Sequence, residues 1–335
     1  PGDTMLFERG SVFRGNLIPT SGTQQQKVTY SSYGQGILPV IMGSVSIFDL
    51  ADKFEKLDDY IYGFPCNSDI GNVIINEGEA FGIKKFALYD LMNPLDYFYD
   101  RNSGVFFIYA DKDIVSLING KSSQYYSVEF CVTQNLIDLS NKHDIVFKEM
   151  EIKNGGAHGF GGSGVYNVLI EGCCISYMGG GFLKYDEDSN PVRYGNGVEF
   201  YNSAAGNVVD SCEIFEIFDT AVTNQGSQNG ASQKNISYTN NLIYNCGMSA
   251  FELWLKGKNT VMSDIAFSVN QVSNIGYGFS SSQNREDNYN LGYFIINFGS
   301  DARMSNIHIE NNTFDGIYNA YGYDCLLLDL GKYKR

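Results

Sequence analysis

The sequence predicts an all-β protein built as a parallel β-helix, a solenoid in which each turn of the chain packs on the next. The first observation is a recurring motif in which an apolar residue stands two places after a small or polar one. Its six occurrences are Met150/Ile152, Cys173/Ile175, Cys212/Ile214, Asn241/Ile243, Asn270/Val272 and Asn312/Phe314. The steps between them are 23, 39, 29, 29 and 42 residues, and the shortest step is about one bare turn of a parallel β-helix.

Composition is the second observation. The chain has 335 residues, with 37 Gly, 6 Pro and 18% charged residues, which suits one large domain or one domain with insertions. Its seven cysteines show neither a metal-binding spacing nor a disulfide framework. Cys173 and Cys212 share a position of the motif, so we expect small core residues there, although stacked neighbours could pair in an oxidising compartment.

Charge and hydropathy restrict the partners. The net charge is −15, from 23 Lys and Arg against 38 Asp and Glu. Nucleic acids and anionic membranes bind basic surfaces, so both are disfavoured, and a polyanionic substrate is less favoured too. No run of about 18 apolar residues occurs, so no membrane span is predicted.

The distribution of the recurring motif and of strand-like segments along the chain suggests three parts. Residues 1–47 read as short strands with turns and are expected to form the first coils, and residues 48–120 lack the motif and are expected to form an inserted β-rich subdomain or rim. Residues 121–335 are expected to form the main β-helix, with regular winding resuming near 126–130. The chain begins at Pro1 without Met or a signal peptide, so we expect the true N-terminus to have been removed or left out of this numbering. The sequence leaves the oligomeric state open.

Polar residues mark the corners of the predicted turns. Matching strands open with Asn or Asp at positions 144, 167, 207, 235, 264 and 306. Such side chains can cap a turn, and identical residues on successive turns can stack and share hydrogen bonds. Asn241, Asn270 and Asn312 extend this logic at the next corner, so we expect them to belong to the scaffold.

A third strand of each turn sets the predicted inside and outside. Because side chains alternate along a strand, an apolar column should face the core and the column beside it should face solvent. The inner column is Phe160, Val198, Val222 and Phe251, and the outer column is Gly161, Glu199, Thr223 and Glu252. Two residues further on, again outward, lie Tyr201, Gln225 and Trp254.

The extra residues of the longer turns gather around this same strand. They fall near 179–195, 226–234, 256–262 and 280–302. Loops crowded around one face of a solenoid form the walls of a groove, and the looped face is commonly the binding face.

Three acids, Glu199, Asp219 and Glu252, are the predicted catalytic groups. Adjacent turns are about 4.8 Å apart, so the backbones of Glu199 and Glu252 should lie about 10 Å apart. Side-chain flexibility could bring the carboxyl groups into the range of about 6.5–9.5 Å used by inverting glycosidases. One or more of them could instead be solvated surface groups or calcium ligands. The residues expected to bind substrate are Arg193, Tyr194, Tyr201, Asn224, Gln225, Trp254 and Lys256.

His158 is a further catalytic candidate because the glycine-rich stretch 155–162 removes bulk around its ring. The register sets it level with Asn196, Thr220 and Ser249, so a structural hydrogen bond within a polar stack is the alternative.

Trp254, the only Trp, is predicted to offer a platform for a sugar ring, although it could also cover an insertion loop. No metal site and no cofactor are predicted, and a calcium ion remains an alternative at the acids.

Four stretches resemble bacterial right-handed parallel β-helix proteins of the pectate-lyase-like superfold. They are 155–160, 193–200 (Arg-Tyr-Gly-Asn-Gly-Val-Glu-Phe), 218–225 and 250–254, and the opening 2–10 with 33–36 resembles the first coils of such chains. The resemblance implies a carbohydrate-active protein, in a superfold that includes polysaccharide lyases, glycoside hydrolases, uronan epimerases and phage tailspikes. Fold alone does not choose among these activities.

The chain departs from the catalytic-residue patterns of two groups in this superfold, and these departures make some of the activities less favoured. The acidic and Gly-His-Gly pattern of pectin hydrolases is not met, because no adjacent Asp pair lies on the predicted strands and His158 precedes the acids. Arg193 is the only Arg between 102 and 284, which disfavours a pectate lyase with an arginine base. The sequence therefore favours a secreted or envelope-associated bacterial glycoside hydrolase acting on a polysaccharide or oligosaccharide. The alternatives are a lyase or epimerase with His158 or Tyr194 as proton shuttle, and a non-catalytic glycan-binding or tailspike-like module.

Overall fold

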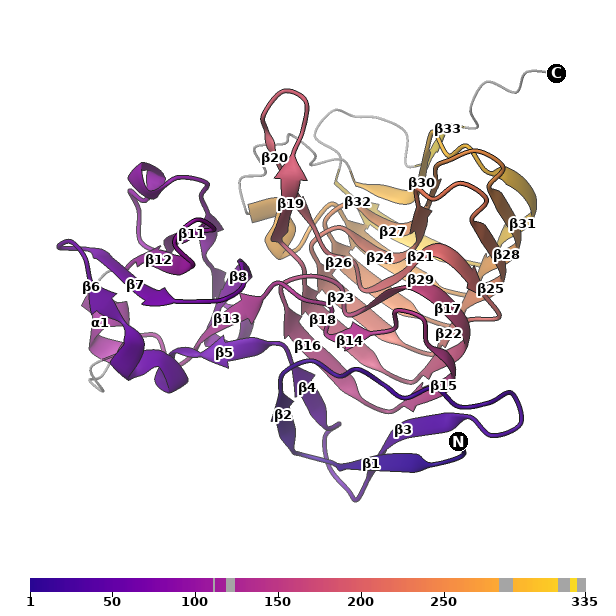
Figure 1. Ribbon diagram of the computed structural model, residues 1–335, viewed down its shortest axis with the longest axis horizontal. Helices are drawn as coiled ribbons and strands as arrows, with labels where there is room; N and C mark the ends of the chain where they lie inside the picture. The colour runs from indigo at the N-terminus through magenta and orange to yellow at the C-terminus, as the bar shows by residue number, and fades with distance from the viewer. Residues whose placement is uncertain (111, 119–123, 283–291, 319–325, 330–335) are drawn as a thin grey trace.

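The computed structural model describes residues 1–110, 112–118, 124–282, 292–318 and 326–329. It confirms the predicted parallel β-helix. Figure 1 shows the coils stacked one on another from the N-terminal strands upward, with a separate β-rich part beside them. Two long sheets, both parallel throughout, form the walls of the solenoid.

Sheet 2 has eight strands, one from each coil. They are β2 (Val12–Arg14), β4 (Val40–Met42), β16 (Glu151–Gly155), β18 (Cys174–Met178), β23 (Glu213–Ile217), β26 (Leu242–Cys246), β29 (Gln271–Ile275) and β32 (Thr313–Ile317). Its register pairs Ile152 with Ile175, Ile214, Ile243, Val272 and Phe314 in succession. The recurring motif of the sequence is therefore this sheet's inward column.

Sheet 1 has fourteen strands and covers the other two faces. One face holds β1 (Thr4–Glu8), β3 (Val28–Tyr33), β15 (His143–Lys148), β17 (Phe160–Glu171), β22 (Val208–Asp210), β25 (Ser232–Thr239), β28 (Val261–Ser268) and β31 (Arg303–Glu310). The other holds β14 (Ile137–Asp138), β21 (Val198–Ala205), β24 (Thr220–Gly226), β27 (Ser249–Leu255), β30 (Tyr293–Phe298) and β33 (Leu326–Asp329). The start of the long strand β17 also belongs to this second face, because it pairs with β14 and β21.

The corners need left-handed backbone, which Asn and Asp adopt more readily than most residues. Asp144, Asn167, Asn235, Asp264 and Asn306 have φ between 52° and 58°. The expectation that these residues open their strands is wrong, because each lies inside its strand, where the left-handed residue turns the chain. The assignment of Asn207 to this set is wrong by one position. Pairing of Leu169 with Val208 puts Asn207 level with Val168, and its Oδ1 accepts the Val168 N–H at 3.0 Å inside the core.

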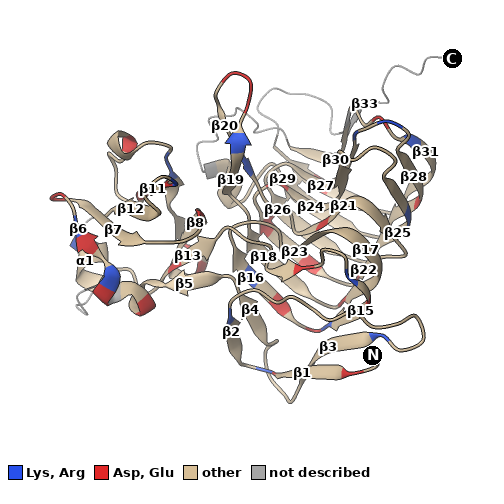
Figure 2. Ribbon diagram, viewed as in Figure 1, with Lys and Arg blue, Asp and Glu red and all other residues tan. Residues whose placement is uncertain are grey.

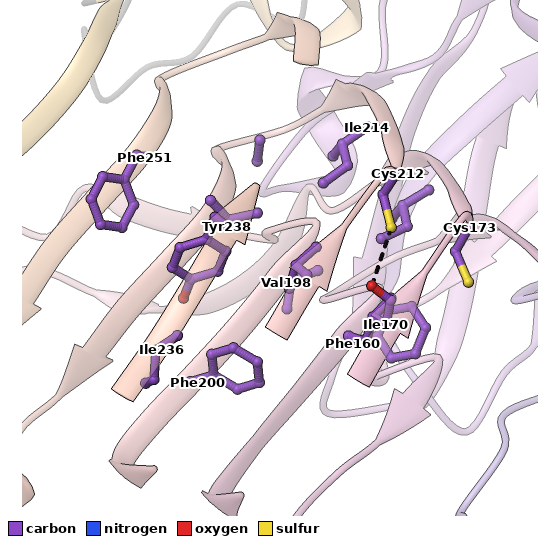
Figure 3. Packing of buried hydrophobic residues seen from close by; sticks show 14 of the residues in the cluster. Phe160, Ile170, Cys173, Val198, Phe200, Cys212, Ile214, Ile236, Tyr238 and Phe251 are labelled. Carbon is purple, nitrogen blue, oxygen red and sulfur yellow. Dashed lines mark hydrogen bonds between the residues drawn. The ribbon is translucent and has the colours of Figure 1, made fainter. Parts of the chain in front are cut away.

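The core runs the length of the solenoid. Figure 3 shows aromatic and aliphatic side chains of successive coils stacked inward, among them Phe200, Tyr238 and Phe251. Cys173 and Cys212 lie in the same stack, and both are free thiols buried in the core. Each further coil adds apolar area removed from water, the main favourable contribution to folding.

The insertion subdomain, defined as residues 44–132, has its own hydrophobic core. One sheet contains β5 (Ser44–Ser46), β8 (Ile70–Ile75), β9 (Ala80–Phe81) and β13 (Val128–Val132). The other contains β6 (Glu55–Lys56), β7 (Ile61–Pro65), β10 (Ile83–Lys84), β11 (Asp96–Asp100) and β12 (Val105–Tyr109). Helix α1 (Lys112–Ile118) and 3-10 helices at Ile47–Lys53, Asn76–Gly78 and Leu88–Asp90 complete it; a fourth 3-10 helix, Phe279–Ser282, follows β29.

The expectation that winding resumes at 126–130 is wrong. Strand β13 pairs antiparallel with β5 and β8, so it closes the subdomain sheet, and winding resumes at β14. The alternating apolar pattern of 128–132 fits either kind of strand, which is why the sequence does not separate them. Among the described residues, no helix is long and apolar enough to cross a lipid bilayer.

Candidate active site

On the face of sheet 1 that contains β21, β24 and β27, the outward-pointing column has the predicted register. Gly161 pairs with Glu199, Glu199 with Thr223, and Thr223 with Glu252. The neighbouring positions Phe160, Val198, Val222 and Phe251 lie in the core. Strand alternation therefore places both glutamates on the outside of the solenoid wall, two coils apart.

The expectation that this column faces open solvent is wrong. Glu199 is 8% exposed, Glu252 is 1% exposed and Thr223 is fully buried. Each carboxylate is engaged by polar side chains, and those contacts remove it from water. Burial without an opposite charge is costly for an ionised carboxylate, so the protonation state of both acids depends on these neighbours.

Glu199 is held through one oxygen. Its Oε2 accepts a hydrogen bond from Asn196 Nδ2 at 3.2 Å and lies 3.3 Å from His158 Nε2. Among the described contacts, the other oxygen, Oε1, accepts none. Burial raises the pKa of Glu199 to about 7, the bond from Asn196 opposes this change, and the charge of Asp219 adds to it.

The tautomer of His158 follows from its other nitrogen. The backbone N–H of Asn196 donates to His158 Nδ1 at 3.0 Å, so the proton of the neutral ring sits on Nε2, the nitrogen that lies 3.3 Å from Glu199 Oε2. Burial lowers the pKa of His158 to about 4, although the charge of Asp219 acts in the opposite direction. Near neutral pH the imidazole is therefore neutral, and its close contact with Glu199 is not an ion pair.

Glu252 is held in the same way. Its Oε2 accepts hydrogen bonds from Thr223 Oγ1 at 2.9 Å and from Gln225 Nε2. In the described part of the chain, no donor reaches Oε1. Burial raises the pKa of Glu252 to about 7; the bonds from Gln225 and Thr223 oppose this, and the charges of Asp219 and Glu199 add to it.

Asp219 influences both glutamates through its charge. Its Oδ2 accepts the Gly195 N–H at 3.0 Å, which ties the residue to the loop that precedes β21. Its charge acts on the pKa of His158, Glu199 and Glu252 alike. The three acids predicted from the sequence thus belong to one electrostatic unit.

The remaining predicted site residues divide into groups. Tyr194 packs its ring edge-on against His158, with centroids 5.2 Å apart, and burial raises the pKa of its phenol. Tyr201, Gln225 and Trp254 share the next outward column and are half-buried, as the register predicts. Gln225 contacts Glu252 directly, whereas the roles of Tyr201 and Trp254 in binding stay predictions.

The prediction for Asn224 is wrong. It pairs with Phe200 and Leu253 in the inward column and is fully buried. Its Oδ1 accepts from Tyr238 and its Nδ2 donates to Gln233, so it satisfies polar groups inside the core. Strand alternation requires this direction once Thr223 points outward.

The two predicted basic residues have other described contacts. Arg193 donates to the carbonyls of Gly180 and Gly71, and its guanidinium lies 4.4 Å from the ring centre of Phe218. Lys256 donates to the carbonyl of Gly299 and lies 3.9 Å from Asp301. Substrate binding by either residue stays a prediction.

Two contributors were missed at the sequence level. Asn196 orients both His158 and Glu199, and its own Oδ1 accepts the Thr220 N–H at 3.1 Å. Thr223 stands in the predicted outer column, so the register already marked it as a neighbour of Glu252. Asn196 carried only a weak signal, its place between two glycines three residues before Glu199.

Within the described residues, no group of three or more His, Cys, Asp or Glu is arranged to hold a metal ion. Figure 2 shows the positions of Lys and Arg dispersed along the ribbon of both parts of the molecule. Among the described residues, neither Glu199 nor Glu252 has an ion pair with a Lys or Arg, and the neutral His158 is the base next to Glu199.

Comparison with known proteins gives remote similarities only. No protein-family model and no curated protein sequence matches the chain. A structure described as a glycoside hydrolase matches over 93% of this chain and 89% of its own, with 10% identity and a TM-score of 0.49. An alginate lyase from Paenibacillus sp. matches over 98% and 93%, with 12% identity and a TM-score of 0.40.

A lacto-N-biosidase from Eubacterium ramulus matches over 98% of this chain but 61% of its own, with 12% identity and a TM-score of 0.44. This chain therefore spans about three fifths of that enzyme's length. These similarities concern the fold, and the assignment of the β-helix rests on the strand pairing described above.

Proposed function

We propose that the protein is a glycoside hydrolase that cleaves a neutral or weakly charged polysaccharide or oligosaccharide with Glu199 and Glu252 as its two carboxylates. The supporting observation is the arrangement of this pair. The two acids lie in one outward column, each is fixed through a single oxygen by polar neighbours, and burial raises the pKa of each to about 7.

A glycosidase needs one protonated and one ionised carboxyl group. A buried pair supplies both forms near neutral pH, because ionisation of one group raises the pKa of the other. The protonated member would deliver its proton to the departing glycosidic oxygen, and the ionised member would activate water or attack the anomeric carbon. The oxygens Oε1 are the ones left for this chemistry.

The spacing is compatible with both stereochemical outcomes. Two coils separate the backbones by about 10 Å. Oε2 of Glu252 accepts from Thr223 on the coil between the two acids. The anomeric form of the first product decides between inversion and retention.

Several observations favour hydrolysis over a lyase or epimerase reaction. A proton shuttle for β-elimination needs a basic atom directed at the substrate. His158 uses Nδ1 to accept from Asn196, and burial raises rather than lowers the pKa of Tyr194. Both Arg193 and Lys256 have partners other than a substrate carboxylate in the described structure.

The test is a panel of neutral glycans and polyuronates, scored for new reducing ends and for the ultraviolet absorbance of an unsaturated product. We expect new reducing ends from a neutral glycan without unsaturated product. Glu199→Gln and Glu252→Gln should each lower turnover by roughly 10²–10⁴-fold, because each removes a proton-transfer group or nucleophile while keeping its shape.

A matched control is Glu216→Gln. Glu216 is also a largely buried acid whose pKa burial raises, but it lies in sheet 2 and accepts from Phe279 and Asn245. This control should leave turnover unchanged. Full activity in both column variants would overturn the site, unsaturated product would support a lyase, and specific binding with no product would support a glycan-binding module.

A further inference from the structure

The hairpin β19–β20, formed by Gly181–Tyr185 and Pro191–Tyr194, joins the subdomain to the acids (Figure 1). Its last residue, Tyr194, packs on His158, which in turn contacts Glu199. The next residue, Gly195, donates to Asp219. Any change in the position of this hairpin is therefore transmitted directly to the proposed catalytic groups.

The subdomain holds the first strand of the hairpin at the same end, its base, through Asp69. This buried residue accepts the backbone N–H of Phe182 at its Oδ2, with a distance of 2.8 Å. Its Oδ1 accepts from the ammonium group of the buried Lys84 at 2.6 Å. Arg101 lies 3.8 Å from the same carboxylate, and its guanidinium stacks 3.6 Å from the ring centre of Phe182.

The subdomain, the hairpin and the solenoid are closely packed around this contact. Arg193 bonds the hairpin to the carbonyl of Gly71 in β8 at 3.1 Å. A Cβ atom at Gly71 would lie 2.4 Å from the carbonyl oxygen of Gly156, and one at Gly180 would lie 2.4 Å from the carbonyl oxygen of Gly71. Subdomain, hairpin and solenoid thus meet backbone to backbone, which only glycine allows.

We propose that Asp69 is a positioning residue for the active centre. By accepting the Phe182 N–H it fixes the hairpin, and through Tyr194 it keeps the His158 ring out of water and within 3.3 Å of Glu199. Lys84 supplies the opposite charge that a buried carboxylate needs. The subdomain thereby forms part of the site although it contributes no group to the reaction. The effect on turnover rests on the proposed function, whereas the effect on His158 does not.

Two variants that lack the Asp69–Lys84 charges separate the role of Asp69 as a hydrogen-bond acceptor from the role of its negative charge. Asp69→Asn/Lys84→Met removes both charges and keeps an oxygen that can accept from Phe182. Asp69→Leu/Lys84→Met removes both charges and the acceptor. If the Leu variant does not fold, Asp69→Ala/Lys84→Met removes the same acceptor without added bulk.

The first readout is the titration of His158 by NMR, which is practical because the chain has three histidines. The His158 signal is assigned by its loss in His158→Gln. In the wild type and in the Asn variant its pKa should be about 4. In the Leu variant the pKa should rise toward the ordinary value of 6.5, because a displaced hairpin admits water to the ring.

The control is another ion pair of the subdomain, Lys85 and Asp96, which are 3.9 Å apart. Asp96 is buried and caps the backbone at Met92 and Asn93, and none of its described hydrogen bonds reaches the hairpin. Asp96→Leu/Lys85→Met should leave the pKa of His158 unchanged. An equal shift in this control and in the Leu variant would reduce Asp69 to a contributor to subdomain stability.

The second readout is turnover on the substrate identified above. The Leu variant should lower kcat by roughly 10–100-fold with little change in KM, since a small displacement of catalytic groups affects the transition state most. A His158 pKa of about 4 in the Leu variant would overturn the positioning role. A shifted His158 in a chain without hydrolase activity would retain the positioning role and overturn the proposed function.

Discussion

Two buried polar columns run along the same solenoid, and they differ in what they leave unsatisfied. In the asparagine column, Asn241 Nδ2 donates to Asn270 Oδ1 and Asn270 Nδ2 donates to Asn312 Oδ1, each at 3.0 Å. The backbone N–H groups of Asn241 and Asn270 donate to the same oxygens at 2.9 Å. Three successive coils repeat asparagine at this position, and each side-chain amide donates to the oxygen of the next.

In the acid column, glutamate alternates with threonine, and the repeat is broken. Thr223 and Gln225 donate to one oxygen of Glu252, and Asn196 donates to one oxygen of Glu199, next to which His158 lies. The comparison teaches that burial of polar groups on a solenoid has two uses. A complete set of partners stabilises the fold, whereas an incomplete set raises the pKa of an acid and leaves an oxygen for chemistry.

The largest expected effect concerns the asparagine column. Asn270→Ala should lower the free energy of unfolding by about 2–4 kcal/mol, since it leaves several buried partners without a hydrogen bond. The measurement is chemical denaturation, with turnover per folded molecule unchanged. The matched control is Asn229→Ala, because Asn229 makes the same kind of bond to the next coil, to Lys258 N–H, but is exposed to water. An equal loss in both would contradict the role assigned to the buried column.

A smaller effect is expected in the pH dependence of stability. Between about pH 4.5 and 7 the folded chain binds more protons at Glu199 and Glu252 than the unfolded chain does, because both pKa values are raised. Stability from these groups therefore falls as pH rises through that window, by roughly 1–3 kcal/mol per acid. His158, whose pKa is lowered to about 4, acts in the opposite direction between about pH 4 and 6.5.

The test compares unfolding of the wild type with that of Glu199→Gln and Glu252→Gln at several pH values. Each variant should gain stability relative to the wild type as pH rises from about 5 to 7.5. A difference that does not depend on pH would mean that the acids have ordinary pKa values.

The smallest expected effect concerns Thr223. Thr223→Val removes one donor from Glu252 and should raise the pKa of this carboxyl further, by about one half to one unit, since that bond favours the ionised form. The pH optimum of turnover should move upward by a similar amount. Thr223→Ser keeps the hydroxyl group and should leave the profile in place, so equal profiles in both variants would exclude this bond as an influence on Glu252.

Much of the solenoid could be predicted because each coil repeats the same pattern of inward and outward positions. The inward column of sheet 2 and the pairing of Glu199 with Thr223 and Glu252 follow from motif spacing and strand alternation alone. The error at Asn207 arose because Gly206 provides the left-handed corner of that coil, which shifts the asparagine into the core. The end of the subdomain was also misplaced, because alternation does not distinguish parallel from antiparallel pairing.

The site was less predictable because it depends on contacts between segments far apart in the chain. Strand direction identified Glu199 and Glu252, but their burial comes from neighbours such as Asn196 and His158, which lie on loops between strands. Asn224 was misassigned by proximity in sequence although alternation requires it to point inward. The contribution of Asp69 involves Phe182, 113 residues further along, which no local pattern reveals.

The most direct test of the central claim is a carboxyl ¹³C NMR titration of glutamate-labelled protein, with Glu199 and Glu252 assigned by their loss in the Gln variants. Two glutamates should titrate near pH 7. In Glu199→Gln the pKa of Glu252 should fall, because a neighbouring like charge has been removed. Titration of both groups near 4.5, or a Glu252 that ignores the loss of Glu199, would contradict the claim that these acids form one coupled catalytic pair.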